Sequence, residues 1–229
     1  MDASRGPGPD SDLFRHVTGL ADVEAALARG EAVVLPNPHP LTSVVAATTA
    51  GVVNTAKGRP SDQAVALWLA EDGPWQELAA VLDLGEQGVA CARHLLVEER
   101  ITALLPVTAA APAWVREAAR DGFVLVFGSC WEPLRPLLSR PLRVSSANRT
   151  GQVPVANAAA ARAVFPPEVH VLADGDGLPA TGRHATTTLR ITRAGLTHIR
   201  PGAQCHAHGG AEAYLAHLAQ TRAGVRALS

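Results

Sequence analysis

Two kinds of short apolar segment alternate along the chain, and this alternation constrains the fold more than any other feature of the sequence. Residues 31–35, 63–69 and 123–127 are short runs rich in valine and leucine, which is typical of buried strands. Residues 21–29 and 86–97 instead repeat apolar side chains at helical spacing. Strands that alternate with helices favour an α/β sheet covered by helices over a helical bundle or an all-β sandwich.

The same patterns predict the remaining elements. Further helices are expected at residues 43–53, 75–82, 113–120, 157–165 and 211–219, and further strands at residues 101–107, 142–145, 168–172, 186–192 and 196–199. A chain of 229 residues with 47% apolar content can bury one substantial core. We therefore expect a mobile tail at residues 1–12, one domain at residues 13–205 and a C-terminal helical extension at residues 206–229.

Charge and cysteine content exclude several classes of protein. The net charge of −1 gives no general attraction to nucleic acid or anionic membranes, so an anion site must come from a local cluster. Cys91, Cys130 and Cys205 are widely spaced and form no Cys-x-x-Cys pair, which fits a reducing cytosol. No apolar run approaches membrane-spanning length, and no signal-peptide pattern is present. We expect a cytoplasmic protein with no membrane or DNA partner.

The only lysine of the sequence stands in the segment Lys57-Gly58-Arg59-Pro60. A residue before proline is pushed out of the helical region, so we expect Arg59 to be extended and to project to the same side as Lys57. An ammonium and a guanidinium that project together suit phosphate or carboxylate, which makes Lys57 and Arg59 the catalytic candidates. The alternative is a solvated basic turn, because most surface charges contribute little.

A second polar pair, Ser146 and Asn148, follows the strand predicted at residues 142–145. In an extended chain the two side chains face the same way. A hydroxyl and an amide at this spacing can donate to phosphate oxygens and orient a ribose or another polar substrate. The alternative is an Asx or Ser turn that closes the strand.

The loop at residues 36–40 contains three prolines and follows a predicted strand, at the end where α/β proteins build sites. His39 is the residue of this loop with the most obvious chemistry, although a surface or packing role is the alternative. We expect no metal site elsewhere. Cys205, His206 and His208 lack a second pair of ligands, and the acidic loop at residues 174–176 lacks the further carboxylates of a calcium loop.

Taken together, these motifs resemble a known family. The segments Lys57-Gly58-Arg59-Pro60, Ser146-Ala147-Asn148, Ala185-Thr186-Thr187 and Arg200-Pro201-Gly202-Ala203 resemble, in order and spacing, the YrdC/TsaC family of threonylcarbamoyladenylate synthases. The resemblance implies an open, twisted, mixed α/β sheet flanked by helices, with a concave basic cavity. Members use ATP, carried with Mg²⁺, together with bicarbonate and L-threonine to form threonylcarbamoyl-AMP and pyrophosphate. The product serves tRNA modification, so tRNA-modification partners are also implied.

The resemblance also implies roles for individual residues. By motif, Lys57 and Arg59 would meet phosphate and carboxylate charge, Ser146 and Asn148 would contact the nucleotide, and Thr186 and Arg200 would lie on the phosphate side. Two anionic reactants must approach a polyanion in this reaction, so charge neutralisation and positioning should dominate catalysis. We assign no protein nucleophile.

Two segments depart from the family pattern. Members carry a Pro-Thr-Asp-Thr-Val-Tyr-Gly-Leu type segment after the first strand, whereas residues 36–43 read Pro-Asn-Pro-His-Pro-Leu-Thr-Ser, with Leu41 in place of the tyrosine. Phe127 stands near the arginine of the family's Arg-Val-Pro segment. We therefore place Asn37, His39, Leu41 and Phe127 around the amine substrate and expect an altered acceptor pocket.

Three hypotheses follow from this sequence. The first is a threonylcarbamoyladenylate synthase-like enzyme. The second is a carbamoyl-adenylating or carbamoyl-transfer enzyme that acts on a different amine or amino acid in specialised biosynthesis. The third is an inactive YrdC-like module that binds nucleotide or RNA, which the neutral net charge disfavours.

Overall fold

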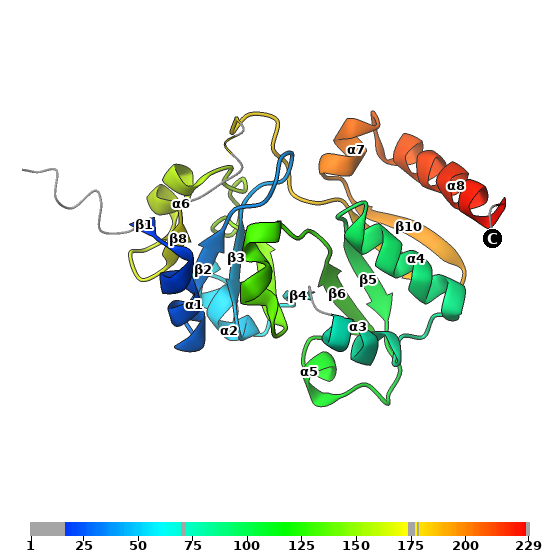
Figure 1. The fold of residues 1–229 in the computed structure, drawn as a ribbon, viewed down its shortest axis with the longest axis horizontal. Coiled ribbons are helices and arrows are strands. Elements are labelled where there is room, and N and C mark those ends of the chain that lie inside the picture. Colours follow the sequence, from blue (N-terminus) through cyan, green and yellow to red (C-terminus); the bar gives the residue numbers. More distant parts are fainter. Residues whose placement is uncertain (1–16, 70–71, 174–176, 178, 228–229) are drawn as a thin grey trace, which may run out of the picture.

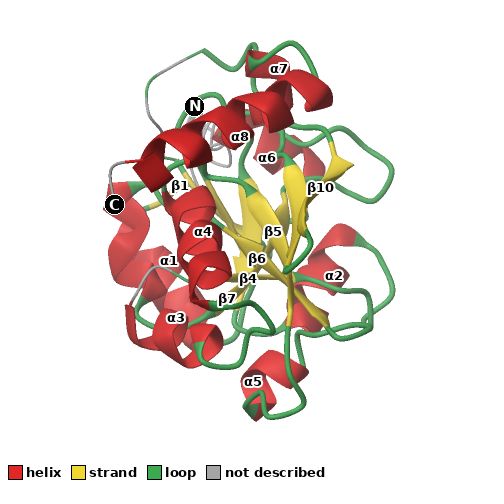
Figure 2. Ribbon diagram, turned by 90° about the vertical axis from the view of Figure 1, so that its right-hand side faces the viewer, coloured by secondary structure: helices red, strands yellow, loops and turns green. Residues whose placement is uncertain are grey.

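The computed structural model describes residues 17–69, 72–173, 177 and 179–227. Within these residues the strands form one ten-stranded sheet, which Figure 1 shows running across the molecule. In Figure 2 the sheet lies in the middle, with helices on both sides of it. The tail expected at residues 1–12 and the acidic loop at residues 174–176 lie outside the described residues.

Helices separate most of the strands along the chain. The strands are β1 (Val17–Thr18), β2 (Val33–Leu35), β3 (Val44–Ala47), β4 (Ala66–Trp68), β5 (Thr102–Pro106), β6 (Phe123–Phe127), β7 (Leu142–Ser146), β8 (His170–Leu172), β9 (Thr188–Thr192) and β10 (Gly195–Arg200). The helices are α1 (Leu20–Ala28), α2 (Ala50–Lys57), α3 (Asp72–Ala79), α4 (Glu86–Val97), α5 (Ala113–Arg116), η1 (Glu132–Leu138, a 3₁₀ helix), α6 (Ala158–Val164), α7 (Ala203–Ala207) and α8 (Ala211–Ala227).

The sheet mixes parallel and antiparallel pairs in the order β1-β8-β2-β3-β7-β4-β6-β5-β9-β10. Strand β8 runs parallel to β1 and β2, β4 runs parallel to β6, and β5 runs parallel to β9. The other neighbours are antiparallel, including the predicted β9–β10 hairpin. This open mixed sheet with flanking helices confirms the predicted α/β fold class.

The helix predicted at residues 43–53 is wrong in its first half. Residues Val44–Ala47 form β3, all four of whose residues are buried, and α2 begins only at Ala50. The β3 side chains alternate between two apolar clusters on opposite faces of the sheet. A strand that is buried on both faces has an uninterrupted apolar sequence, which cannot be told from a buried helix by its period.

The helices cover the two faces unequally. On one face, α2 and α6 pack against β2, β3 and β8, while α3, α4 and α8 pack against β4, β5, β6 and β9. On the other face, α1 and η1 pack against β2, β3 and β7. We call this second face the cavity face, because the part of it that α1 and η1 leave open holds the cavity described below.

The C-terminal helices lie at the β10 end of the sheet, as Figure 1 shows. Helix α8 continues to Ala227, beyond the predicted end at residue 219, whereas α5 ends at Arg116 instead of residue 120. Tyr214 and Leu218 of α8 are buried in the same apolar cluster as α4 and β5. A division between a domain and an extension at residue 205 stays a prediction. None of the described helices combines the length and the apolar character needed to cross a membrane.

Candidate active site

A cavity lies on the cavity face of the sheet, above strands β7, β4 and β6. Val144 and Ala66 are cross-strand partners on this face, and Leu125 and Phe127 continue the surface on β6. The cavity encloses about 710 Å³, part of which is continuous with the solvent. Seven of the residues predicted for the site line it: Asn37, Leu41, Arg59, Phe127, Ser146, Thr186 and Arg200. Segments that are distant in the sequence therefore meet around one hollow.

The backbone around Lys57 differs from the prediction. Lys57 is the last residue of α2, not part of an extended segment, and Gly58 ends the helix in the left-handed conformation at φ 64°. Glycine adopts this conformation without the steric cost that a side chain would add. The turn sends Lys57 and Arg59 to different environments. Lys57 is 3% exposed and does not line the cavity, whereas Arg59 does.

The Lys57 ammonium connects α2 to the end of β7. Its Nζ donates to the backbone oxygen of Ser146 and to Asn148 Oδ1, the latter at 2.7 Å. The Ser146 hydroxyl donates to the same Asn148 oxygen at 2.7 Å. From the other side, the Thr150 backbone N–H donates to the Lys57 carbonyl oxygen at 3.1 Å. The lone lysine and the predicted serine–asparagine pair thus form one hydrogen-bonded network.

Burial shifts the protonation equilibrium of this lysine. Burial, followed by the charges of Arg59 and Arg200, lowers the pKa of Lys57 to about 7. The ammonium therefore loses its proton easily near neutral pH. A neutral amine still has two N–H groups, enough to keep both hydrogen bonds.

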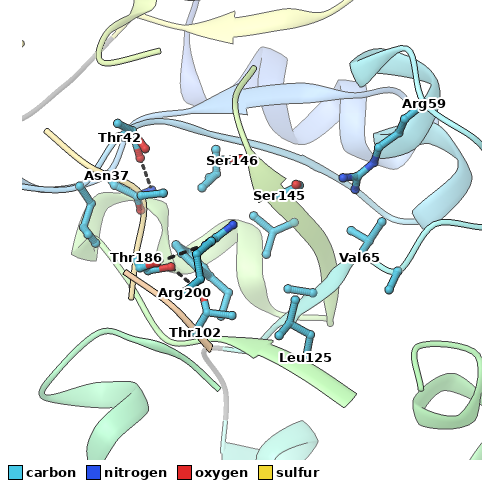
Figure 3. A pocket seen from close by; sticks show the side chains of 17 residues that line it. Asn37, Thr42, Arg59, Val65, Thr102, Leu125, Ser145, Ser146, Thr186 and Arg200 are labelled. Carbon is cyan, nitrogen blue, oxygen red and sulfur yellow. Dashed lines mark hydrogen bonds between the residues drawn. The ribbon is translucent and has the colours of Figure 1, made fainter. Parts of the chain in front are cut away.

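Arg59 and Arg200 present guanidinium groups to the cavity. Figure 3 shows the two side chains reaching toward the middle of the cavity from different sides. Arg59 Nε donates to Asn54 Oδ1 at 2.5 Å, while its Nη2 is buried and has no hydrogen-bond partner within the part of the chain that the structure describes. Arg200 Nη2 donates to the Thr186 carbonyl oxygen at 3.4 Å. A buried guanidinium nitrogen without a partner beside a second cation is an arrangement suited to an anion.

The first loop lines the cavity through Asn37 and Leu41, both buried. The Asn37 amide donates to the Thr42 carbonyl oxygen at 2.9 Å, and its Oδ1 accepts from the Ser129 hydroxyl at 3.3 Å. Both ends of this side chain are therefore held by the protein. His39 is exposed and lies outside the lining, so the structure does not bring it to the cavity as predicted.

Arg183 joins this loop to the opposite wall. Its Nη1 donates to the carbonyl oxygens of Asn37 and Leu41, each at 2.9 Å, and its Nε donates to the Pro179 carbonyl oxygen at 3.0 Å. The residues that follow Arg183 include Thr186, which lines the cavity. The two walls are thus hydrogen-bonded to each other through one side chain.

The Thr186 wall rests on close backbone contacts. Its hydroxyl and that of Thr102 are hydrogen-bonded at 2.6 Å. A Cβ added to Gly202 would lie 2.3 Å from the Ala185 carbonyl oxygen and from backbone atoms of Thr186 and Thr187, so only glycine fits there. Glycine at this position lets the chain after β10 lie directly on the wall.

Four residues of the site escaped the sequence analysis: Asn54, Thr102, Ser129 and Arg183. Thr102, Ser129 and Arg183 bond to distant parts of the chain, as Ser129 does to Asn37 across 92 residues, whereas Asn54 bonds to residues five to nine positions away. The sequence signals near the Thr186 wall were the Ala185-Thr186-Thr187 and Arg200-Pro201-Gly202 segments. Cys205, His206 and His208 diverge instead of converging: Cys205 is buried in the core, and the rings of His206 and His208 stack on different partners.

Comparison with known proteins places this geometry in a known fold. No protein-family model matches the chain, and no curated protein matches it in sequence. Among solved structures, P. abyssi Sua5 in complex with L-threonine matches with a TM-score of 0.61 and 20% identity, over 80% of this chain. The chain has the fold of Sua5. The matched part is 54% of the Sua5 chain, so the protein spans about half the length of that relative.

Two other structures share the fold of Sua5. E. coli YciO matches with a TM-score of 0.60 and 14% identity, over 80% of this chain and 88% of YciO. HypF in its phosphate- and nucleotide-bound form matches with a TM-score of 0.61 and 14% identity, over 85% of this chain and 31% of HypF. The predicted YrdC-like fold is thereby confirmed. At these identities the likeness establishes the fold, and the chemistry has to be argued from the cavity.

Proposed function

We propose that this protein forms a carbamoyl-adenylate from ATP, bicarbonate and an amine. The amine and bicarbonate form a carbamate and release water. A carbamate oxygen then attacks the α-phosphorus of ATP, and pyrophosphate leaves with the electrons of the broken P–O bond. In the reaction that the family resemblance implies, the amine is L-threonine and the product serves tRNA modification. Magnesium enters as part of the MgATP substrate, and we assign it no protein ligand.

The observation that carries this proposal is the pair of guanidiniums, Arg59 and Arg200, that reach into one cavity. A carbamate and a triphosphate repel each other in solution, and cations in a partly dry site offset that repulsion far better than water does. The buried Arg59 Nη2 gains the hydrogen bond it lacks when an anion arrives. Arginine can also bind phosphate or carboxylate oxygens through two parallel hydrogen bonds.

We assign the Lys57–Ser146–Asn148 network a positioning role beside these cations. Ser146 lines the cavity, and Lys57 holds its backbone oxygen and the Asn148 side chain from behind. A nucleotide that replaces one of these internal partners would meet a preorganised group, which avoids reorganisation during the reaction. This proposal requires no protein nucleophile.

The first experiment measures pyrophosphate release by the purified protein with MgATP, bicarbonate and each amino acid in turn. We expect release that requires both bicarbonate and an amine. Arg59→Ala should lower the rate strongly, whereas Arg149→Ala should leave it unchanged, because Arg149 is exposed and outside the cavity lining. Silence with every amine, together with tight nucleotide or RNA binding, would favour the inactive binding module instead.

A further inference from the structure

Five apolar side chains form the centre of the cavity floor. Val44, Ala66, Val144, Leu125 and Phe127 come from strands β3, β4, β7 and β6, and the cross-strand register places all five on the cavity face. Phe127 packs edge to face on Trp68 with 5.5 Å between ring centroids, which fixes its ring in the floor. Leu125 is half-buried, so it presents more surface to the cavity than the four buried residues.

Four polar side chains that border this floor, those of Asn37, Thr102, Ser146 and Thr186, are bonded to other protein groups, and the hydroxyl-bearing Thr42 and Ser145 also line the cavity. The Thr102 and Thr186 hydroxyls are hydrogen-bonded to each other at 2.6 Å. The Asn37 side chain has partners at both ends, and the Ser146 hydroxyl donates to Asn148. Arg59 Nη2, in contrast, is buried and has no hydrogen-bond partner among the described residues, so the guanidinium side of the cavity holds an unused donor.

This division selects for a ligand with two unlike parts. An anionic group fits the guanidinium side, since Arg59 and Arg200 bind carboxylate or phosphate oxygens. The part that rests on Leu125, Phe127 and Val144 loses its contacts with water and gains no hydrogen bond in return. A hydroxyl buried there would be left without a partner, whereas a methyl group would gain from burial.

We propose that the acceptor amine is an amino acid with an apolar side chain, aliphatic or aromatic, that packs on this floor. The inference rests on the carbamoyl-adenylation proposed above and names the class of its acceptor. Threonine and valine are a matched pair of probes, because they have nearly the same shape and differ by a hydroxyl in place of a methyl group. An apolar pocket discriminates against an added hydroxyl by about a hundredfold at most, so we expect a preference of about tenfold to a hundredfold for valine.

The test measures two quantities for L-valine, L-leucine, L-phenylalanine and L-threonine. Calorimetry gives the affinity of each amino acid for the protein without turnover, and pyrophosphate release gives its kcat/KM. Higher affinity and higher kcat/KM for valine or the larger apolar amino acids support the inference. A preference for threonine in either measurement overturns it and leaves the carbamoyl-adenylation intact. No binding of any of the four also overturns it. Stronger binding of valine without pyrophosphate release supports the apolar floor and contradicts the proposed reaction.

A pair of variants ties the preference to the floor. Leu125→Thr adds a hydroxyl where the acceptor side chain rests and should bring the valine-to-threonine ratio close to one. Leu104 is the cross-strand partner of Leu125 on the same face, equally half-buried, but it lies outside the cavity lining. Leu104→Thr should therefore keep the wild-type ratio, and circular dichroism verifies that both variants fold. Equal ratios in the two variants would show that the floor does not select the acceptor.

Discussion

Lys57 and Arg200 are both cations beside the same cavity, but their surroundings differ. Lys57 is 3% exposed and donates to two oxygens of the protein, one on Ser146 and one on Asn148. Arg200 is exposed, and its Nη2 donates to the Thr186 carbonyl oxygen over 3.4 Å. Lys57 therefore supports the protein structure beside the cavity, whereas Arg200 is available to a ligand. The rarity of lysine in this sequence thus leads to a residue next to the cavity, but the contacts of Lys57 differ from the ligand-facing role that the sequence predicts.

This comparison predicts that removing the ligand-facing cation affects activity and hardly affects stability. We expect Arg200→Ala to lower kcat/KM for ATP by about 10²–10³-fold, since a lost donor to developing charge has about this effect. The midpoint of thermal unfolding should stay close to that of the wild type. Arg190→Ala is the matched control, because Arg190 is exposed on the neighbouring strand β9 and outside the lining. A similar loss in both variants would mean that only the net charge matters.

A second prediction concerns the wall that carries Arg200. Gly202→Ala places a Cβ 2.3 Å from backbone atoms of residues 185–187, so the wall or the β10 end must move. We expect the free energy of unfolding in urea to fall by about 3 kcal/mol, the upper part of the range for overpacking. Gly51→Ala is the control, since a Cβ there meets nothing within 4 Å. If Gly202→Ala matched this control in stability, the tight contact would be refuted.

The third prediction concerns the hydrogen bonds from Lys57 to Ser146 and Asn148. We expect Lys57→Ala to lower the free energy of unfolding by about 1 kcal/mol, because it removes one of two donors from each of two oxygens; the Asn148 N–H still donates to the Ser146 backbone oxygen, and the Ser146 hydroxyl to Asn148 Oδ1. Activity should fall as well, through the displaced Asn148. Arg149→Ala removes a nearby exposed cation and should change stability little. An unchanged unfolding midpoint in Lys57→Ala would show that Lys57 does not stabilise the structure and would favour a direct contact with the ligand.

The smallest effect predicted is a pH dependence of anion binding. The pKa of Lys57 is about 7 in the free protein, and a bound anion should raise it by attraction. Below pH 6 the ammonium is charged in both states, so Lys57 adds no pH dependence to the affinity for inorganic pyrophosphate. Above pH 7 only the complex holds the proton, so the affinity of the wild type should fall, relative to that of Lys57→Met, by up to about tenfold per pH unit.

Calorimetry in two buffers with different ionisation enthalpies measures the proton uptake directly. Pyrophosphate itself titrates in this pH range, so Lys57→Met is the reference: at pH 8 it should take up about one proton fewer on binding than the wild type does. Equal proton uptake by the two proteins would show that Lys57 does not sense the anion.

The strongly periodic elements were predictable from local sequence. Helix α4 and strand β6 have the predicted bounds, because amphipathic spacing and a valine-rich run each have one good solution. Strand β3 was not predictable in this way, since its burial on both faces removes the alternation that marks a strand.

The residues of the site can also be separated into those that the sequence indicates and those that it does not. The association of Lys57 with Ser146 and Asn148 follows from motifs that resemble a family, and the structure places these residues in contact. The helical backbone at Lys57 was missed although Gly58 is a local signal for the end of a helix. The partners Ser129 and Thr102 could not be predicted, because each depends on a contact between distant segments. The rule for a residue before proline constrains the backbone of Arg59 alone. It does not require Lys57, two residues earlier, to be in an extended conformation.

The Arg183 side chain has a consequence for how this protein could acquire a new substrate. It ties the loop at Asn37 and Leu41 to the opposite wall through two carbonyl oxygens, so neither segment can be remodelled without breaking the other's support. Because these bonds go to the backbone, they persist whatever side chains occupy the loop. The substrate range should therefore change through substitution of individual side chains while the backbone of the loop stays the same. Insertions in this loop should be rare among descendants that keep the arginine.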